Sequence, residues 1–266
     1  MLRNVFLKTL HEQQRSLVGW LTAVVGIVLM YAAIWPSIRD QPSMSDFLDQ
    51  MPEAFRSLFA SSGADMSTPT GYIQIELMSF MGPILVILYA VVQGSRGVAG
   101  EEDRRTMDLL LAQPVGRVRV LLEKGAAMVV GTVLLAAVLG LALVLEGRGF
   151  DMELPADKVA AAMTHLALLG LVFGAIALAI GAVSGSLGLS RGVPAVVAVV
   201  AYVVNGLGPM VDWLEPLQRF SPFYQYIGHD PLRTGLSGPA IGVSVATIAV
   251  LIAVAALGFV RRDVRG

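Results

Sequence analysis

Six apolar runs, each long enough to cross a bilayer, constrain this chain more than any other feature. They cover approximately residues 17–34, 72–93, 124–145, 160–183, 192–211 and 239–260. A hydrocarbon core of roughly 30 Å is crossed by about 20 residues of α-helix. Hydrocarbon offers backbone N–H and C=O groups no partner, and the runs lack the alternation of barrel strands. The predicted fold is therefore an all-α membrane protein with six transmembrane helices.

Composition agrees with this fold and excludes several kinds of chemistry. Of the 266 residues, 55% are hydrophobic and 15% are charged, against roughly 45–50% and about 25% in soluble domains. The mean hydropathy is +0.70. With no cysteine, the chain can form neither disulfides nor thiolate metal sites. Its three histidines lie in three different segments, so no metal centre built on histidine is expected.

The distribution of basic residues predicts the orientation of the chain. Thirteen of the 19 lysines and arginines lie before the first run, between the second and third, between the fourth and fifth, and after the sixth. Loops rich in Lys and Arg stay in the cytoplasm. Both termini are therefore predicted to be cytoplasmic, in a multi-pass protein of a bacterial inner (plasma) membrane.

Two segments outside the six runs are predicted to be short helices at the membrane surface. Residues 1–16 form an amphipathic pattern, read as a cytoplasmic interfacial helix ahead of a six-span domain covering 17–266. Between spans five and six the chain is apolar but interrupted by Pro216, Pro222 and Pro231. Short re-entrant helices are predicted there, because proline ends a straight span.

The loop between spans two and three carries the most specific pattern. A helix is predicted over 101–113, with Glu101 and Glu102 at its amino end, where the helix dipole favours acids. Met107, Leu110 and Leu111 form an apolar stripe, and Pro114 ends the helix. A basic loop that only sets topology needs no such helix. The pattern therefore favours docking to a cytoplasmic partner, with a plain basic loop as the alternative.

These motifs resemble the ABC-2 type permease family. Glu101-Glu102, Leu109-Leu110-Leu111 and Pro114-Val115-Gly116-Arg117 match its pattern between spans two and three. Residues 220–224 with 230–232, and the closing residues 259–263, match two further stretches, so that the resemblance covers essentially the whole chain. One departure is Arg105, because the family often has glycine before the threonine.

The resemblance implies that two permease copies, identical or related, pair in the bilayer. Each copy would dock one ATPase subunit through the loop above, the coupling helix, and no nucleic acid is expected as a partner. The residues assigned to docking are Glu101, Glu102, Arg104, Arg105, Met107, Leu110, Leu111, Pro114 and Arg117.

The resemblance also implies that spans two and five line the pathway. Met78 and Met81 offer a soft lining, and Pro83 is predicted to kink span two. Glu76 is an ionisable residue inside a span, and Asn205 needs a polar partner. For each of these residues, packing or interfacial anchoring is the competing reading.

The chain is predicted to be a transport subunit and not an enzyme. No Gly-Lys pair is present, so a Walker A loop is excluded, and ATP and Mg²⁺ are expected to bind a separate ATPase. The predicted function is ATP-driven export of a hydrophobic or amphipathic compound, such as a drug or lipid, from the cytoplasm or inner leaflet. The alternative is a gradient-driven secondary transporter or channel. An intramembrane enzyme would have to use His165 with Glu76, the only candidate pair.

Overall fold

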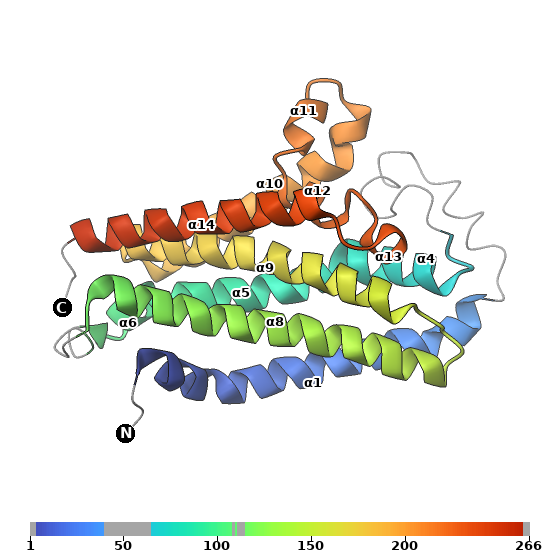
Figure 1. Ribbon diagram of the computed structural model, residues 1–266, viewed down its shortest axis with the longest axis horizontal. Coiled ribbons are helices and arrows are strands. Elements are labelled where there is room, and N and C mark those ends of the chain that lie inside the picture. Colours follow the sequence, from blue (N-terminus) through green and yellow to red (C-terminus); the bar gives the residue numbers. More distant parts are fainter. Residues whose placement is uncertain (1–3, 40–64, 108–109, 111–114, 263–266) are drawn as a thin grey trace.

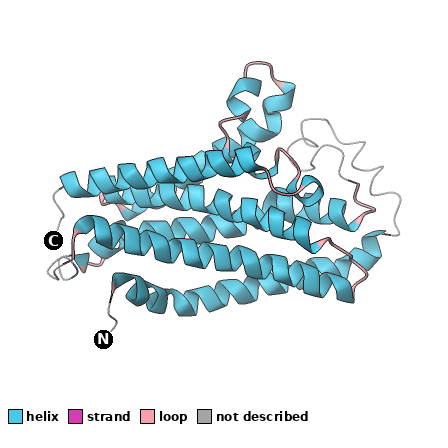
Figure 2. Ribbon diagram, viewed as in Figure 1, coloured by secondary structure: helices cyan, strands magenta, loops and turns pink. Residues whose placement is uncertain are grey.

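The computed structural model describes residues 4–39, 65–107, 110 and 115–262, and within these ranges all regular secondary structure is helical. Six helical stretches are long and apolar enough to cross a membrane (Figures 1 and 2). They are α1 (Val5–Arg39), α4 with η1 and α5 (Pro69–Gly97), α8 (Arg117–Gly149), α9 (Ala156–Ser184), α10 with η2 (Leu187–Met210) and α14 (Gly238–Arg261). The predicted all-α membrane fold with six transmembrane helices is confirmed.

The amino-terminal segment joins the first span without a break. Helix α1 runs from Val5 to Arg39, so no helix end separates the predicted interfacial helix from the first span. At about 1.5 Å per residue its 35 residues measure about 52 Å, well beyond the hydrocarbon core. Val5, Thr9 and Gln13 are buried along one face of its first turns, and the Phe6 amide donates to Glu123 Oε2 of α8 at 3.0 Å. The start of α1 is therefore fixed to the start of α8.

Helix α9 forms the centre of the bundle. In its most apolar 18-residue stretch 78% of the residues are buried, against 11% in α10, and α9 contacts α5, α8, α10 and α14. Its glycines permit this close packing: a Cβ at Gly94 of α5 would collide with the Gly174 carbonyl oxygen of α9. A Cβ at Gly170 would lie 2.5 Å from Val86 Cγ1 of α5.

The second span contains a π-helix that the sequence analysis does not predict. It consists of α4 (Pro69–Ile73), the π-helix η1 (Gln74–Met81) and α5 (Gly82–Gly97). The Gly82 amide donates to the Leu77 carbonyl, five residues earlier, which is the π pattern. Pro83, the next residue, has no amide hydrogen to donate to the preceding turn. The structure thus places a widened stretch of helix just before Pro83, and the kink itself stays a prediction.

Short helices join the last two spans, as predicted, but no membrane position is defined for them. They are α11 (Glu215–Gln218), α12 (Pro222–Ile227) and α13 (Pro231–Thr234), each with proline in its first two positions. Pro216, Pro222 and Pro231 therefore begin helices here as well as interrupting the apolar segment. Helix α12 is held to the bundle by Tyr226, whose hydroxyl donates to the Met78 carbonyl at 2.9 Å.

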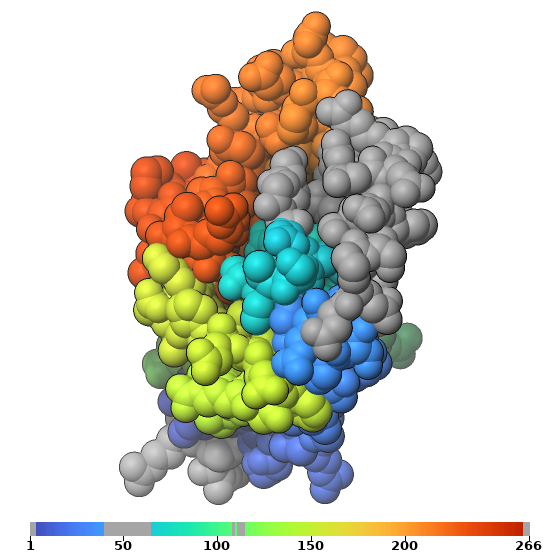
Figure 3. Space-filling view, turned by 90° about the vertical axis from the view of Figure 1, so that its right-hand side faces the viewer, coloured from blue at the N-terminus to red at the C-terminus, as the bar shows by residue number. Residues whose placement is uncertain are grey.

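The two ends of the bundle differ in what they present. One end, here named the α6 end, holds α6 (Ala99–Asp103), the start of α1 and the end of α14 (Figure 1). The opposite end, named the α4 end, holds the carboxyl end of α1, helix α4, the α8–α9 connection and α13 (Figure 3). The start of α1 and the end of α14 thus lie at the same end of the molecule, as an even number of spans requires.

Candidate functional site

The candidate site lies at the α6 end. The sequence predicts one continuous helix over 101–113 there, and this prediction is wrong. Helix α6 ends at Asp103, and Arg104 and Arg105 form a turn before Met107 resumes helical structure. Arg105 has φ +55°, a left-handed conformation that glycine adopts most easily. Glycine, which the family resemblance leads one to expect at this position, would adopt this conformation with less strain. The sequence analysis thus misses a turn at Arg104 and Arg105.

Glu101, the first of the two acids in α6, points into the bundle and forms a buried ion pair. Its carboxylate accepts hydrogen bonds from Lys124 Nζ of α8 and from Thr106 Oγ1. The side chains of Glu101 and Lys124 are only 10% and 4% exposed. Burial favours the neutral acid, but the charge of Lys124 and the two hydrogen bonds outweigh it and lower the pKa of Glu101 below its usual value. Glu101 is therefore ionised and fixes α6 to α8.

Glu102, the second acid, pairs with the far end of the chain. Its carboxylate accepts two hydrogen bonds from Arg262, one of them from Nη1 at 2.9 Å and the other from Nη2. Arg262 Nε also donates to the Ala182 carbonyl near the end of α9, at 3.1 Å. Arg117 of α8 in turn donates to the Arg262 carbonyl at 2.7 Å. We name Glu101, Glu102, Lys124, Arg117 and Arg262 the α6 junction.

A glycine makes room for this junction. Gly185 follows the last residue of α9 with φ +67°, the usual left-handed end of a helix. A Cβ there would collide with Arg262 Nη1 and lie 2.6 Å from Glu102 Oε2. Glycine is therefore required at this position both for its conformation and for the space it leaves.

The apolar residues of the predicted docking stripe also face the bundle where they are described. Met107 is buried in a cluster with Val98, Leu121, Leu178 and Phe259, and Leu110 packs partly against that cluster. Leu111 and Pro114 lie outside the described residues. Arg117 lies over the Phe259 ring at 5.8 Å. Met107, like Glu101 and Glu102, therefore holds the loop in place and does not present its side chain to a partner.

Asp103, Arg104 and Arg105 are the exposed residues of the turn. They lie between the two ion-paired acids and the buried Met107, so both sides of the turn are anchored. A partner that touches this turn would contact one acidic and two basic side chains. It would also press on α8, α9 and α14 through the α6 junction.

The candidate pathway residues are partly brought together. Met78 is buried and its sulfur accepts from the Tyr226 hydroxyl at 3.4 Å, and Pro83 is buried nearby in α5. Glu76 and Met81 are half-buried. Helices α5 and α10 are in contact, and Phe80 of η1 stacks edge-on against Tyr202 of α10 at 6.2 Å.

Asn205, the candidate in span five, follows Tyr202 by three residues. Its backbone carbonyl accepts from Gln218 Nε2 at 2.9 Å, while its side-chain Oδ1 is buried without a partner in the part of the chain that is described. Asn205 Oδ1 can therefore accept a hydrogen bond from a group outside the described residues.

The candidate pair for an enzyme has other neighbours. His165 of α9 stacks against His229 with ring centroids 4.3 Å apart, and its Nε2 accepts from the Ser237 amide at 3.2 Å. These contacts tie α9 to the segment that leads into α14. They give His165 a structural role that does not involve Glu76.

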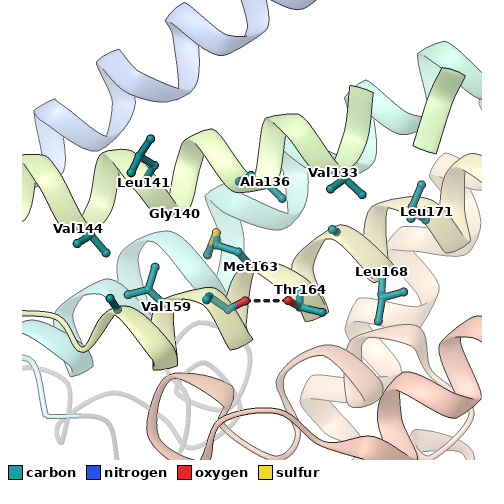
Figure 4. Close-up of a pocket in the computed structure, with 14 residues that line it drawn as sticks. Val133, Ala136, Gly140, Leu141, Val144, Val159, Met163, Thr164, Leu168 and Leu171 are labelled. Atoms are coloured by element: carbon teal, nitrogen blue, oxygen red, sulfur yellow. Dashed lines mark hydrogen bonds between the residues drawn. The ribbon is translucent and has the colours of Figure 1, made fainter. Parts of the chain in front are cut away.

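An apolar groove of about 540 Å³ runs between α8 and α9 (Figure 4). Its lining is Val133, Ala136, Ala137, Gly140, Leu141, Val144, Ala156, Val159, Ala160, Met163, Thr164, Ala167, Leu168 and Leu171. The hydroxyl of Thr164 donates to the Ala160 carbonyl at 2.8 Å, so it is already engaged. The groove therefore offers mainly apolar contact, as a site for hydrocarbon chains does.

Comparison with known proteins identifies the family. The model of the family described as "Multidrug efflux system permease Rv1217c, C-terminal domain" matches residues 2–260, nearly the full length of the chain. No curated protein matches the chain. The match and the six spans confirm the resemblance to ABC-2 type permeases drawn from the sequence motifs. The family description is that of a permease, which is a membrane transport protein. The chain therefore belongs to the family of the multidrug efflux system permease Rv1217c, C-terminal domain.

Proposed function

We propose that the chain is the permease subunit of an ATP-driven efflux pump in a bacterial plasma membrane. Two permease copies would pair and each would dock one ATPase, which binds ATP and Mg²⁺. The cargo would be a hydrophobic or amphipathic compound taken from the cytoplasm or the inner leaflet. The family description, which names multidrug efflux, supports this assignment, and so does the distribution of basic residues, which predicts cytoplasmic termini.

The α6 junction is the observation that carries the proposal. An exposed turn at Asp103–Arg105 is anchored by two ion pairs to α8 and to the last residues after α14. Arg262 also holds the end of α9 through the Ala182 carbonyl. Because buried ion pairs resist separation, a movement imposed on the turn is passed to three spans at once. Docking is thus assigned to the exposed side chains of the turn, and Glu101, Glu102 and Met107 transmit its movement.

The test uses the permease co-expressed with its candidate ATPase, chosen as the ATPase that co-purifies with the wild-type permease from its native membrane. Arg104→Glu with Arg105→Glu reverses the exposed charge of the turn and leaves the buried ion pairs untouched. We expect co-purification of the ATPase to fall at least tenfold, with ATP-dependent dye uptake into inside-out vesicles lost. Arg148→Glu, an exposed change at the α4 end, is the matched control and should alter neither measurement.

A second variant probes the buried side of the same loop. Leu110→Asp places a charge against the apolar cluster around Met107 and should uncouple hydrolysis from transport. If both variants retain the ATPase and transport dye normally, the turn is not the docking site. Uptake that persists without ATPase and stops when an ionophore collapses the proton gradient would instead support the secondary transporter.

A further inference from the structure

The second span leaves one narrow face uncovered, and that face ends in an arginine. Ile84, Leu88, Val92 and Arg96 follow each other at every fourth position of α5, so they line one side of the helix. Leu88 is exposed and the other three are half-buried, whereas nearly all the rest of α5 is buried. The face is apolar over its first three members and cationic at the α6 end.

Two more arginines converge on Arg96. Arg191 of α10 donates from Nε to the hydroxyl of Ser95, the residue before Arg96, at 3.2 Å. Arg104 and Arg191 both lie close enough to repel the Arg96 guanidinium. Glu101 and Glu102 are engaged elsewhere, by Lys124 and Arg262, and the remaining described acid of this segment, Asp103, lies exposed next to Arg104. Arg96 itself forms no hydrogen bond or ion pair with any described residue, and its Nε is buried.

Buried polar groups without partners continue from Arg96 into the span. Gln93 is only 3% exposed, and neither its Oε1 nor its Nε2 has a partner among residues 4–39, 65–107, 110 and 115–262. The Tyr89 hydroxyl is in the same situation. Tyr89, Gln93 and Arg96 are spaced at i, i+4 and i+7, which places them on one face of α5. Buried polar atoms in native proteins are paired as a rule, so these atoms mark a polar strip inside the bundle that continues from Arg96.

A role in setting topology does not account for this arrangement. Basic residues that orient a membrane protein only need to lie in the correct loop. They need neither converge on one guanidinium nor continue into a buried amide and a buried phenol. The positive charges of Arg96 and Arg191 favour an anion, and guanidinium groups match the planar, two-oxygen geometry of carboxylate and phosphate.

We propose that Arg96 and Arg191 bind the anionic headgroup, a phosphate or carboxylate, of an amphipathic molecule whose apolar part lies along Ile84, Leu88 and Val92. If the bound molecule is cargo, which rests on the proposed function, then the pump selects anionic amphipaths over neutral or cationic ones.

Trp20 of α1 provides a built-in reporter for the test. Its ring lies 6.0 Å from the Tyr89 ring in an edge-on contact. The other two tryptophans, Trp35 and Trp213, are replaced by phenylalanine, and the full-length permease is reconstituted without ATPase in phosphatidylcholine vesicles. Brominated phosphatidylglycerol or brominated phosphatidylcholine is then added as the quencher of Trp20 fluorescence.

We expect the anionic lipid to quench Trp20 with about tenfold higher apparent affinity than the zwitterionic lipid, as loss of a charged hydrogen bond typically implies. Arg96→Gln and, separately, the exposed Arg191→Gln should bring this ratio close to one. Arg119→Gln at the same end, on α8, is the control and should leave the ratio unchanged. Added salt should reduce the ratio, because the arginines are partly exposed.

Competition separates the possible sources of the anion. Dodecyl phosphate should relieve the quenching, and inorganic phosphate should do so only weakly if the apolar face contributes. Equal competition by inorganic phosphate would overturn the amphipath and leave a simple anion site. Equal quenching by both lipids, or equal loss of selectivity in the Arg119 control, would overturn the site altogether.

The reconstituted sample contains no ATPase, so the outcome is independent of transport. Selectivity without ATP-driven uptake would leave the site standing and count against the proposed pump. If Trp35→Phe disrupts folding, anionic lipid retained through purification, measured by mass spectrometry for the wild-type chain and for Arg96→Gln, replaces the fluorescence readout. Equal retention by the two proteins would then overturn the proposal.

Discussion

At the scale of single residues, the ion pair between Glu101 and Lys124 offers the clearest measurable effect. Glu101→Gln leaves the Lys124 ammonium buried without its counter-charge, which should cost about 3–5 kcal/mol of stability. The double variant Glu101→Gln with Lys124→Met removes both charges and should recover most of that loss. The midpoint of thermal unfolding in detergent measures both effects, and equal loss in the single and double variants would contradict the pairing.

The same pair gives the chain a defined response to acid. Because the pKa of Glu101 is lowered from its ordinary value of 4.5, its contribution is complete above that value and is lost as the pH falls through the lowered one. Wild-type permease should therefore lose stability in that acidic window more steeply than the Glu101→Gln, Lys124→Met double variant.

The left-handed conformation of Arg105 leads us to expect that glycine substitutions at 105 and at 104 change stability in opposite directions. In the left-handed region a residue with a Cβ costs about 1–2 kcal/mol, and glycine's extra flexibility costs about 0.5–1 kcal/mol. Arg105→Gly should therefore stabilise the protein by about 0.5–1 kcal/mol. Arg104, with φ −85°, is the matched control, and Arg104→Gly should destabilise it by a similar amount. Chemical denaturation in detergent distinguishes the two signs, and the same sign for both would refute the turn.

Residue partners were the least predictable part of the site. The sequence shows Glu101 and Glu102 and predicts that they lie at the amino end of a helix, where the helix dipole favours acids. Their cations lie 23 and 160 residues away, so no local pattern connects them. Two positions in the sequence could have indicated the junction. They are Gly185 and position 105, where the family resemblance implies glycine, because the backbone is left-handed at both.

At the scale of helices, the α5–α9 contact depends on glycine. Gly94→Ala would place a methyl group against the Gly174 carbonyl and should cost about 1–3 kcal/mol through overpacking. A Cβ added at Gly192 in α10 would meet nothing within 4 Å, so Gly192→Ala should gain up to about 1 kcal/mol of helix propensity. Thermal unfolding of the two variants checks the contrast, and equal effects would mean that α5 and α9 do not touch at Gly94.

Helix positions were predictable because they depend on local composition. Each apolar run lies inside or at the end of one observed span, and proline correctly marked the short helices α11, α12 and α13. The π-helix was not predictable, since a hydrogen bond to the fifth preceding residue leaves no periodic trace in a stretch of only eight residues. The predicted continuous helix over 101–113 was wrong because charge and apolar spacing carry no information about the left-handed backbone of Arg105.

At the scale of the whole molecule, orientation remains the prediction with the simplest test. The chain has no cysteine, so Arg104→Cys at the α6 end and Glu153→Cys in the α8–α9 connection each introduce a single thiol. In right-side-out vesicles a membrane-impermeant maleimide should label position 153 at once. Position 104 should react only after the vesicles are permeabilised. The reverse pattern would invert the orientation and place the turn outside the reach of a cytoplasmic ATPase.

The distance along the chain between Glu102 and Arg262 has a consequence for how the protein is made. A ribosome adds about 5–20 residues per second, so Arg262 is synthesised roughly 10–30 s after Glu102, 160 positions earlier. Throughout that interval the carboxylate has no counter-charge, and the contact that holds α6 to the end of α9 cannot close. Before residue 262 leaves the ribosome, the nascent chain therefore lacks one of the two ion pairs that anchor the Asp103–Arg105 turn. The α6 junction closes only after α14 has been made, so the order of synthesis makes this contact one of the late steps in assembling the bundle.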